Sequence, residues 1–87
     1  MLSDFKTMPQ NGYLYFSAPW CVPCKRMHPI LDALPVEILE IDADLSHKLA
    51  AQLGVSSLPT IIKIVDGKPV AWLRGGKSPQ EVREFVK

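Results

Sequence analysis

The feature that most constrains this chain is a pair of cysteines, Cys21 and Cys24, that are separated by two residues. They are the only 2 cysteines in the sequence. A short aromatic-rich segment typical of a β-strand precedes them, and a segment with the apolar spacing of an α-helix follows. In that context a close cysteine pair indicates redox chemistry more strongly than an isolated Cys-x-x-C motif does.

The position of Cys21 at the start of the predicted helix favours its reactive form. The backbone N–H groups of a first helical turn lack partners, and the helix dipole is positive there. Such a position, helped by nearby cations such as Lys25, lowers a cysteine pKa from about 8.5 to roughly 3.5–7.5 and favours the thiolate. Pro23 suits the first turn because it has no N–H to lose. Cys24 lies one turn further on, so one cysteine can attack a disulfide while the other resolves the mixed intermediate.

The composition limits the size and class of the protein but does not identify a binding partner. The 87 residues, of which 47% are hydrophobic, suit one small domain over residues 1–87. A net charge of +1 and no basic stripe predict no nucleic-acid partner. The sequence shows no signal-peptide pattern and no run of about 20 apolar residues. We therefore expect a cytoplasmic protein that does not associate with a membrane. In a reducing cytoplasm a close cysteine pair is more often catalytic or metal-binding than structural.

The apolar pattern predicts one α/β domain in the order strand, helix, strand, helix, strand, strand, helix. Residues 1–11 have the weakest pattern, and Ser3 or Asp4 is expected to cap only a short helical turn. Pro29 is expected to kink the helix that contains it, and turn, glycine and capping signals mark boundaries at Gly54, Asp66-Gly67 and Ser78 with Glu81. The expected strands span residues 13–17, 36–41, 60–65 and 69–74, and the expected helices span 22–34, 45–53 and a last segment that opens at Ser78.

Residues 16–25, Phe-Ser-Ala-Pro-Trp-Cys-Val-Pro-Cys-Lys, resemble the active-site segment of the thioredoxin family. Ser57-Leu58-Pro59-Thr60 resembles the cis-proline loop of that family, and Gly75 matches the glycine that lines its substrate groove. The resemblance extends over almost all of residues 13–87. It implies the thioredoxin fold in a small, glutaredoxin-sized form, with a central mixed four-stranded sheet flanked by three helices.

The resemblance also assigns roles to site residues. Cys21 is expected to be the nucleophile and Cys24 the resolving cysteine, with no metal and no cofactor beyond their own disulfide. The residues expected to support the active site are Trp20, Val22, Pro23, Lys25 and Pro59. The residues expected to bind substrate are Trp20, Leu58, Pro59, Thr60 and Gly75. The Leu58–Pro59 peptide bond is expected to be cis.

Two positions depart from the family pattern. Thioredoxins commonly bury an aspartate beneath the second cysteine and a lysine on the neighbouring strand, and this chain has Tyr15 and Ile38 there. Glu40 lies two residues beyond Ile38, so its side chain should point to the same side of the strand. It is a candidate to accept the proton of Cys24, beside water or the departing thiolate of the substrate.

The resulting hypothesis is a monomeric oxidoreductase that reduces disulfide-bonded protein substrates and is recharged by a thioredoxin-reductase-like donor. One alternative is a glutaredoxin-like protein recharged by glutathione, for which Lys63 and Arg74 are the cations to place. A second is a binding subunit whose cysteines are incidental. A zinc or iron–sulfur site is a third, but zinc takes about four ligands and His28 and His47 lack ligand spacing to the cysteines.

Overall fold

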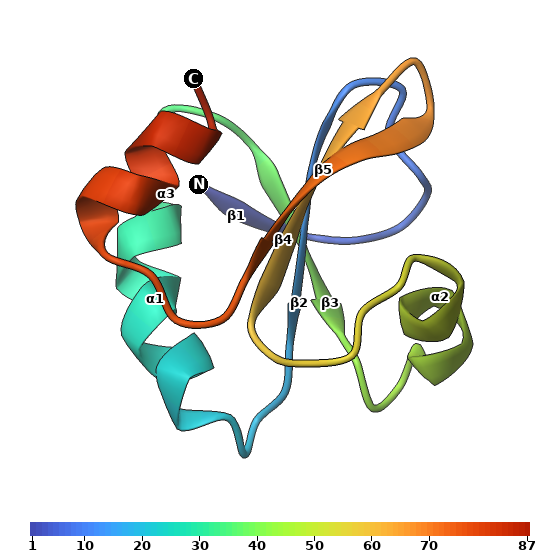
Figure 1. Ribbon diagram of the computed structural model, residues 1–87, viewed down its shortest axis with the longest axis horizontal. Coiled ribbons are helices and arrows are strands. Elements are labelled where there is room, and N and C mark those ends of the chain that lie inside the picture. The colour runs from blue at the N-terminus through green and yellow to red at the C-terminus, as the bar shows by residue number, and fades with distance from the viewer.

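The computed structural model describes residues 1–87 and contains five strands and three helices. Figure 1 shows α1 and α3 together on one side of a central sheet and α2 on the other side. The helices are α1 (Val22–Asp32), α2 (His47–Gln52) and α3 (Pro79–Phe85). The strands are β1 (Leu2–Asp4), β2 (Gly12–Ser17), β3 (Ile38–Asp42), β4 (Thr60–Val65) and β5 (Lys68–Arg74).

The sheet has the strand order β1-β3-β2-β4-β5, with β2 at its centre. Strands β1 and β2 both run parallel to β3, whereas β4 is antiparallel to β2 and to β5. Tyr15 in the middle of β2 lies opposite Glu40 of β3 on one side and Ile61 of β4 on the other. The central strand therefore has β3 on one side and β4 on the other, and the short loop after Ser17 leads to the cysteine pair.

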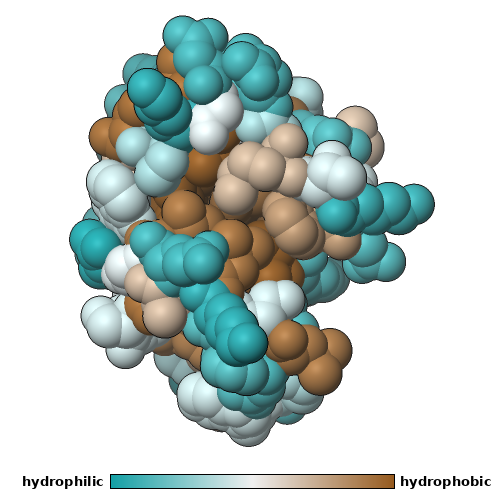
Figure 2. Space-filling model, turned by 90° about the vertical axis from the view of Figure 1, so that its right-hand side faces the viewer, coloured by the Kyte–Doolittle hydropathy of each residue, from teal (hydrophilic) through white to brown (hydrophobic).

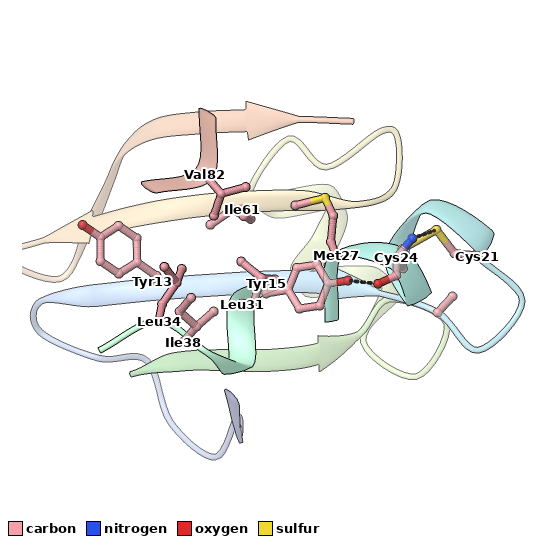
Figure 3. Close-up of a cluster of buried hydrophobic side chains, with 11 residues drawn as sticks. Tyr13, Tyr15, Cys21, Cys24, Met27, Leu31, Leu34, Ile38, Ile61 and Val82 are labelled. Carbon is pink, nitrogen blue, oxygen red and sulfur yellow. Dashed lines mark hydrogen bonds between the residues drawn. A yellow bond between two sulfur atoms is a disulfide. The ribbon is translucent and has the colours of Figure 1, made fainter. Parts of the chain in front are cut away.

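Successive side chains of β2 point to opposite faces of the sheet, so this strand contributes to two cores. Tyr13 and Tyr15 lie in a cluster with Met27 of α1, Val82 of α3 and both cysteines (Figure 3). Leu14 and Phe16 lie in the second cluster, which contains Ala50 of α2. The two-layer burial of β2 explains why its sequence has no polar residue before Ser17.

The face that α2 covers is less completely closed than the face that α1 and α3 cover. Helix α2 contains only 6 residues. Seen from that side, Figure 2 shows apolar residues gathered in a hollow and ringed by hydrophilic ones. The partly buried side chains packed against the second core include Phe5, Leu39, Leu49, Leu53 and Trp72.

The predicted four-stranded sheet is wrong in its strand number, because residues 2–4 add a fifth strand at the edge. Ser3 and Asp4 lie in this strand and do not cap a helical turn. Strand β1 pairs with β3 in parallel, with Leu2 opposite Ile38. A strand of 3 residues has too few positions to show a period, and its partner is distant in the sequence.

The remaining elements follow the predicted order, with boundaries shifted by a few residues. Helix α1 ends at Asp32 and contains Pro29, and Gly54 follows α2 with a φ of 72°, which favours glycine. Ser78 and Glu81 form the predicted capping box at the start of α3. None of the three helices combines the length and apolar character needed to cross a bilayer.

Candidate active site

The cysteine pair lies where the central strand passes into α1. Cys21 occupies the position before the helix with an extended backbone, and its N–H donates to the carbonyl of Ala18 at 3.1 Å. Cys21 and Cys24 form a disulfide with their Cα atoms 5.3 Å apart. The Sγ of Cys21 also accepts a hydrogen bond from the backbone N–H of Cys24 at 3.2 Å (Figure 3). The sulfur of Cys21 thus caps the helix, as predicted from the sequence.

The disulfide is recessed below a more exposed rim. Each cysteine is 3% exposed, whereas Trp20 is 65% exposed and Val22 also protrudes. The indole N–H of Trp20 donates to Oδ2 of Asp44 at 2.7 Å, which fixes the ring against the loop after β3. Pro23 and Lys25 are exposed on the first turn of α1. Trp20 and Val22 therefore form part of the exposed rim next to the recessed disulfide.

The loop before β4 is fixed by hydrogen bonds at both ends. The Leu58–Pro59 peptide bond is cis, as the resemblance implied. Thr60 is fully buried, and its hydroxyl donates to the carbonyl of Ser57 at 2.8 Å. The N–H of Gly75 donates to the carbonyl of Pro59 at 2.8 Å. Gly75 has a φ of 87°, in the left-handed region that side chains with a Cβ seldom adopt.

Trp20 and Leu58 line one shallow, mostly apolar pocket of about 320 Å³. Its floor is formed largely by small side chains, among them Ala50 and Ala51 of α2, together with Val55. In this pocket Trp20, which the resemblance assigns to substrate binding, meets the loop that leads to Pro59. An apolar side chain of a partner fits such a surface better than a charged group does.

A second cleft of about 550 Å³, in which polar residues outnumber hydrophobic ones, reaches Cys24 from the side of β3. Tyr15, Glu40 and His28 line it together with Cys24. The hydroxyl of Tyr15 donates to the backbone carbonyl of Cys24 at 2.9 Å. Burial, and secondarily the charge of Glu40, raises the pKa of Tyr15 well above its usual range. Tyr15 is thus a neutral hydrogen-bond donor at this site.

Glu40 lines the same cleft as Cys24, on the side of β3 that its spacing from Ile38 indicated. Its Oε2 accepts a hydrogen bond from the hydroxyl of Ser17 at 3.1 Å and lies 3.7 Å from Nδ1 of His28. The sequence interpretation missed Ser17, although a signal was available, since Ser17 is two residues from Tyr15 on β2 and so points to the same face of the sheet. His28 lies at the helix surface one turn after Cys24, with its side chain 52% exposed.

Of the two cations considered for binding glutathione, Arg74 makes other contacts and Lys63 lies away from the cysteines. The guanidinium of Arg74 lies 5.5 Å from the ring centroid of Trp72 and donates to the carbonyl of Gly54 at 3.2 Å. Lys63 lies in the middle of β4, opposite Tyr13 and Ala71. Three residues of an extended strand, about 10 Å, separate it from Thr60 at the active-site end.

The comparisons with known proteins agree with this arrangement. The sequence model of the Thioredoxin family matches residues 8–87. A thioredoxin of Chlamydia muridarum is 50% identical over 76 residues, which cover 82% of this chain and 74% of the relative. A thioredoxin of Haemophilus influenzae is 34% identical over 94 residues, covering 97% of this chain and 88% of the relative. A solved thioredoxin of Nicotiana alata superposes with a TM-score of 0.80 at 30% identity, over 88% of this chain and 70% of that one.

Proposed function

The chain belongs to the thioredoxin family and is a thiol–disulfide oxidoreductase, and from this premise we propose that it reduces protein disulfides with Cys21 as nucleophile and Cys24 as resolving cysteine. The observation that carries the assignment of roles is the capping position of Cys21. Its sulfur receives the Cys24 N–H at the positive end of α1, where a thiolate is stabilised. Cys24 lies inside the helix, so its sulfur does not occupy a capping position of this kind.

The reaction follows from thiol–disulfide exchange. The Cys21 thiolate attacks one sulfur of a substrate disulfide, a mixed disulfide forms, and the other substrate sulfur leaves as a thiolate and takes up a proton. Cys24 then loses its proton and attacks the sulfur of Cys21. The Cys21–Cys24 disulfide closes and the second substrate thiol is released. Two electrons pass from the two cysteines to the substrate, so no cofactor beyond this disulfide is needed.

The surroundings of the disulfide support a protein substrate over glutathione. Trp20, Leu58 and Gly75 are proposed to form the substrate surface, with Val22, Pro23 and Lys25 supporting the cysteine pair. The side chains of Pro59 and Thr60 are fully buried, so these two residues are proposed to hold the loop in place behind that surface. The pocket beside Trp20 is mostly apolar, and Arg74 is already engaged with Trp72 and Gly54. Of the two cations considered for a glutathione clamp, Arg74 is therefore already engaged and Lys63 lies away from the active-site end of β4.

After each turnover the disulfide must be reduced again. We propose a thioredoxin-reductase-like protein as the donor and a monomer as the working form. A cytoplasmic location is proposed because a reducing compartment maintains the dithiol on which the reaction depends.

Paired serine variants test the roles of the cysteines. We expect Cys21→Ser to abolish reduction of a protein disulfide such as oxidised insulin. Cys24→Ser should instead accumulate a mixed disulfide between Cys21 and the substrate, detected by mass spectrometry after acid quenching. Equal residual activity in the two variants would contradict this assignment. Full biological function of a double serine variant would favour the alternative of a binding subunit with incidental cysteines.

A further inference from the structure

The resolving step creates a chemical requirement that the cysteines alone do not meet. Cys24 must lose its proton before it attacks the mixed disulfide, because the thiolate is the nucleophile. The residue is 3% exposed, so bulk water has little direct access to it. The cleft of about 550 Å³ does reach Cys24 and is large enough to hold several water molecules. A proton acceptor for Cys24 is therefore to be sought along this cleft.

The titratable groups of the cleft come from every element around it. They are Asp4 of β1, Tyr15 of β2, Cys24, Lys25 and His28 of α1, and Glu40 and Asp42 of β3. Tyr15 is neutral and donates to the Cys24 carbonyl, and Lys25 is a cation, so neither is an acceptor. The Oδ1 of Asp42 accepts two backbone N–H groups of the turn after β3, those of Asp44 and Leu45 at 2.9 and 3.4 Å, whereas the carboxylate of Glu40 accepts no backbone hydrogen bond and is not tied to a turn.

Two carboxylates of β3 lie opposite β2, Glu40 across from Tyr15, whose hydroxyl donates to the Cys24 carbonyl, and Asp42 across from Ser17. Asp4 is one strand further out, opposite Glu40. The Glu40 side chain is 30% exposed, so it is accessible to water in the cleft. The Ser17 hydroxyl and the His28 ring approach the same oxygen, Oε2, from β2 and α1. This leaves the other oxygen, Oε1, without a partner in the chain.

Building on the function proposed above, we propose that Glu40 accepts the proton of Cys24 through a water molecule in the cleft, and that Ser17 and His28 position its carboxylate. In the mixed disulfide, the water takes the Cys24 proton as it passes its own proton to Glu40. The electron pair of the Cys24 sulfur forms the bond to Cys21. The bond between Cys21 and the substrate sulfur breaks, and the substrate leaves as a thiolate that is protonated by solvent.

Single-turnover kinetics with Glu40→Gln test the proposal. The reduced protein is mixed with oxidised insulin, quenched with acid at intervals and analysed by mass spectrometry, so that formation and resolution of the mixed disulfide are measured separately. General base catalysis contributes at least about 100-fold, so we expect resolution at pH 7 to slow by about that factor while formation is unchanged. Because the variant depends on hydroxide to remove the Cys24 proton, its resolution rate should rise about 10-fold per pH unit while the thiol is protonated, and more steeply than in the parent.

Two further variants separate proton transfer from structure. Asp4→Asn removes the same charge from the same cleft one strand away and should leave both steps unchanged. Ser17→Ala keeps the carboxylate but removes its hydrogen bond, so resolution should slow by less than in Glu40→Gln and keep the parent's pH profile. These results together assign the effect to the Glu40 carboxylate.

The outcomes against the proposal are distinct. Resolution by Glu40→Gln at the parent's rate and with the parent's pH profile rules Glu40 out as the acceptor. Equal slowing of formation and resolution assigns Glu40 a structural role and also rules out the proposal. A parent protein that forms no mixed disulfide with insulin contradicts the proposed function itself, and this inference with it.

Discussion

The hydroxyl of Tyr15 donates a buried hydrogen bond of 2.9 Å to the backbone carbonyl of Cys24. It joins the middle of the central strand to the first turn of α1. Figure 3 shows the phenol directed along the strand toward Cys24, with the disulfide beyond it. The contact fixes the helix start, and with it the resolving cysteine, against the most buried strand of the sheet.

Replacing Tyr15 by phenylalanine should destabilise the protein by about 1 kcal/mol, because a buried hydrogen bond is lost while the ring remains. For a domain of this size that corresponds to a fall in Tm of about 4–8 °C. Thermal unfolding of the oxidised protein measures the change. Tyr13→Phe is the matched control, since Tyr13 packs its ring against Phe85 but its hydroxyl has no hydrogen-bond partner in the chain. An equal fall in Tm in both variants would mean that loss of the hydrogen bond to Cys24 is not what destabilises Tyr15→Phe.

Stability should decrease above pH 10, and Tyr15 should account for part of that decrease. Burial raises the pKa of Tyr15 above its ordinary value of 10.0, and the charge of Glu40 adds to the shift. Below pH 10 the phenol is neutral in both states, but above it the unfolded chain releases a proton that the folded chain keeps. The free energy of unfolding then falls by at most about 1.4 kcal/mol per pH unit from this residue. Urea unfolding between pH 9 and 11 should show a shallower decline for Tyr15→Phe than for the parent.

Trp20→Ala should impair reduction of a protein disulfide more than reduction of a small one. The exposed Trp20 ring borders the apolar pocket beside the disulfide, and an aromatic anchor of this kind commonly contributes more than 1 kcal/mol to binding. We expect kcat/KM for oxidised insulin to fall by about 10-fold, equivalent to about 1.4 kcal/mol. The rate with 5,5′-dithiobis(2-nitrobenzoic acid) should change little. Trp72→Phe, a substitution beyond the pocket, should affect neither substrate.

The equilibrium reduction potential of the Cys21–Cys24 pair should identify the direction of the reaction. For a reductant we expect a value near the roughly −270 mV of thioredoxin, measured against a dithiothreitol or glutathione buffer. A value of about −180 to −120 mV would indicate an oxidant or isomerase and would contradict the proposed direction. Failure to form a reversible intramolecular disulfide would contradict the oxidoreductase assignment as a whole.

The sequence alone predicted the features whose physical cause is local. The capping position of Cys21, the capping box of Ser78 with Glu81, and the hairpin turn at Asp66 depend on residues within a few positions of each other. Helix and strand periods are also local, so the order of the elements from β2 onward was predicted with boundary shifts of a few residues. The similarity of residues 16–25 to the thioredoxin family added the expected chemistry.

The tertiary structure decided what depends on residues that are distant in sequence. Strand β1 exists because it pairs with β3, and a segment of 3 residues carries no sign of that partner. The same holds for the cleft of about 550 Å³, where β2, α1 and β3 bring Tyr15, His28 and Glu40 around Cys24. Spacing along β3 indicated the side on which Glu40 lies, but only the register between β2 and β3 places it opposite Tyr15. Register is set by packing across the whole sheet, and a single strand does not encode it.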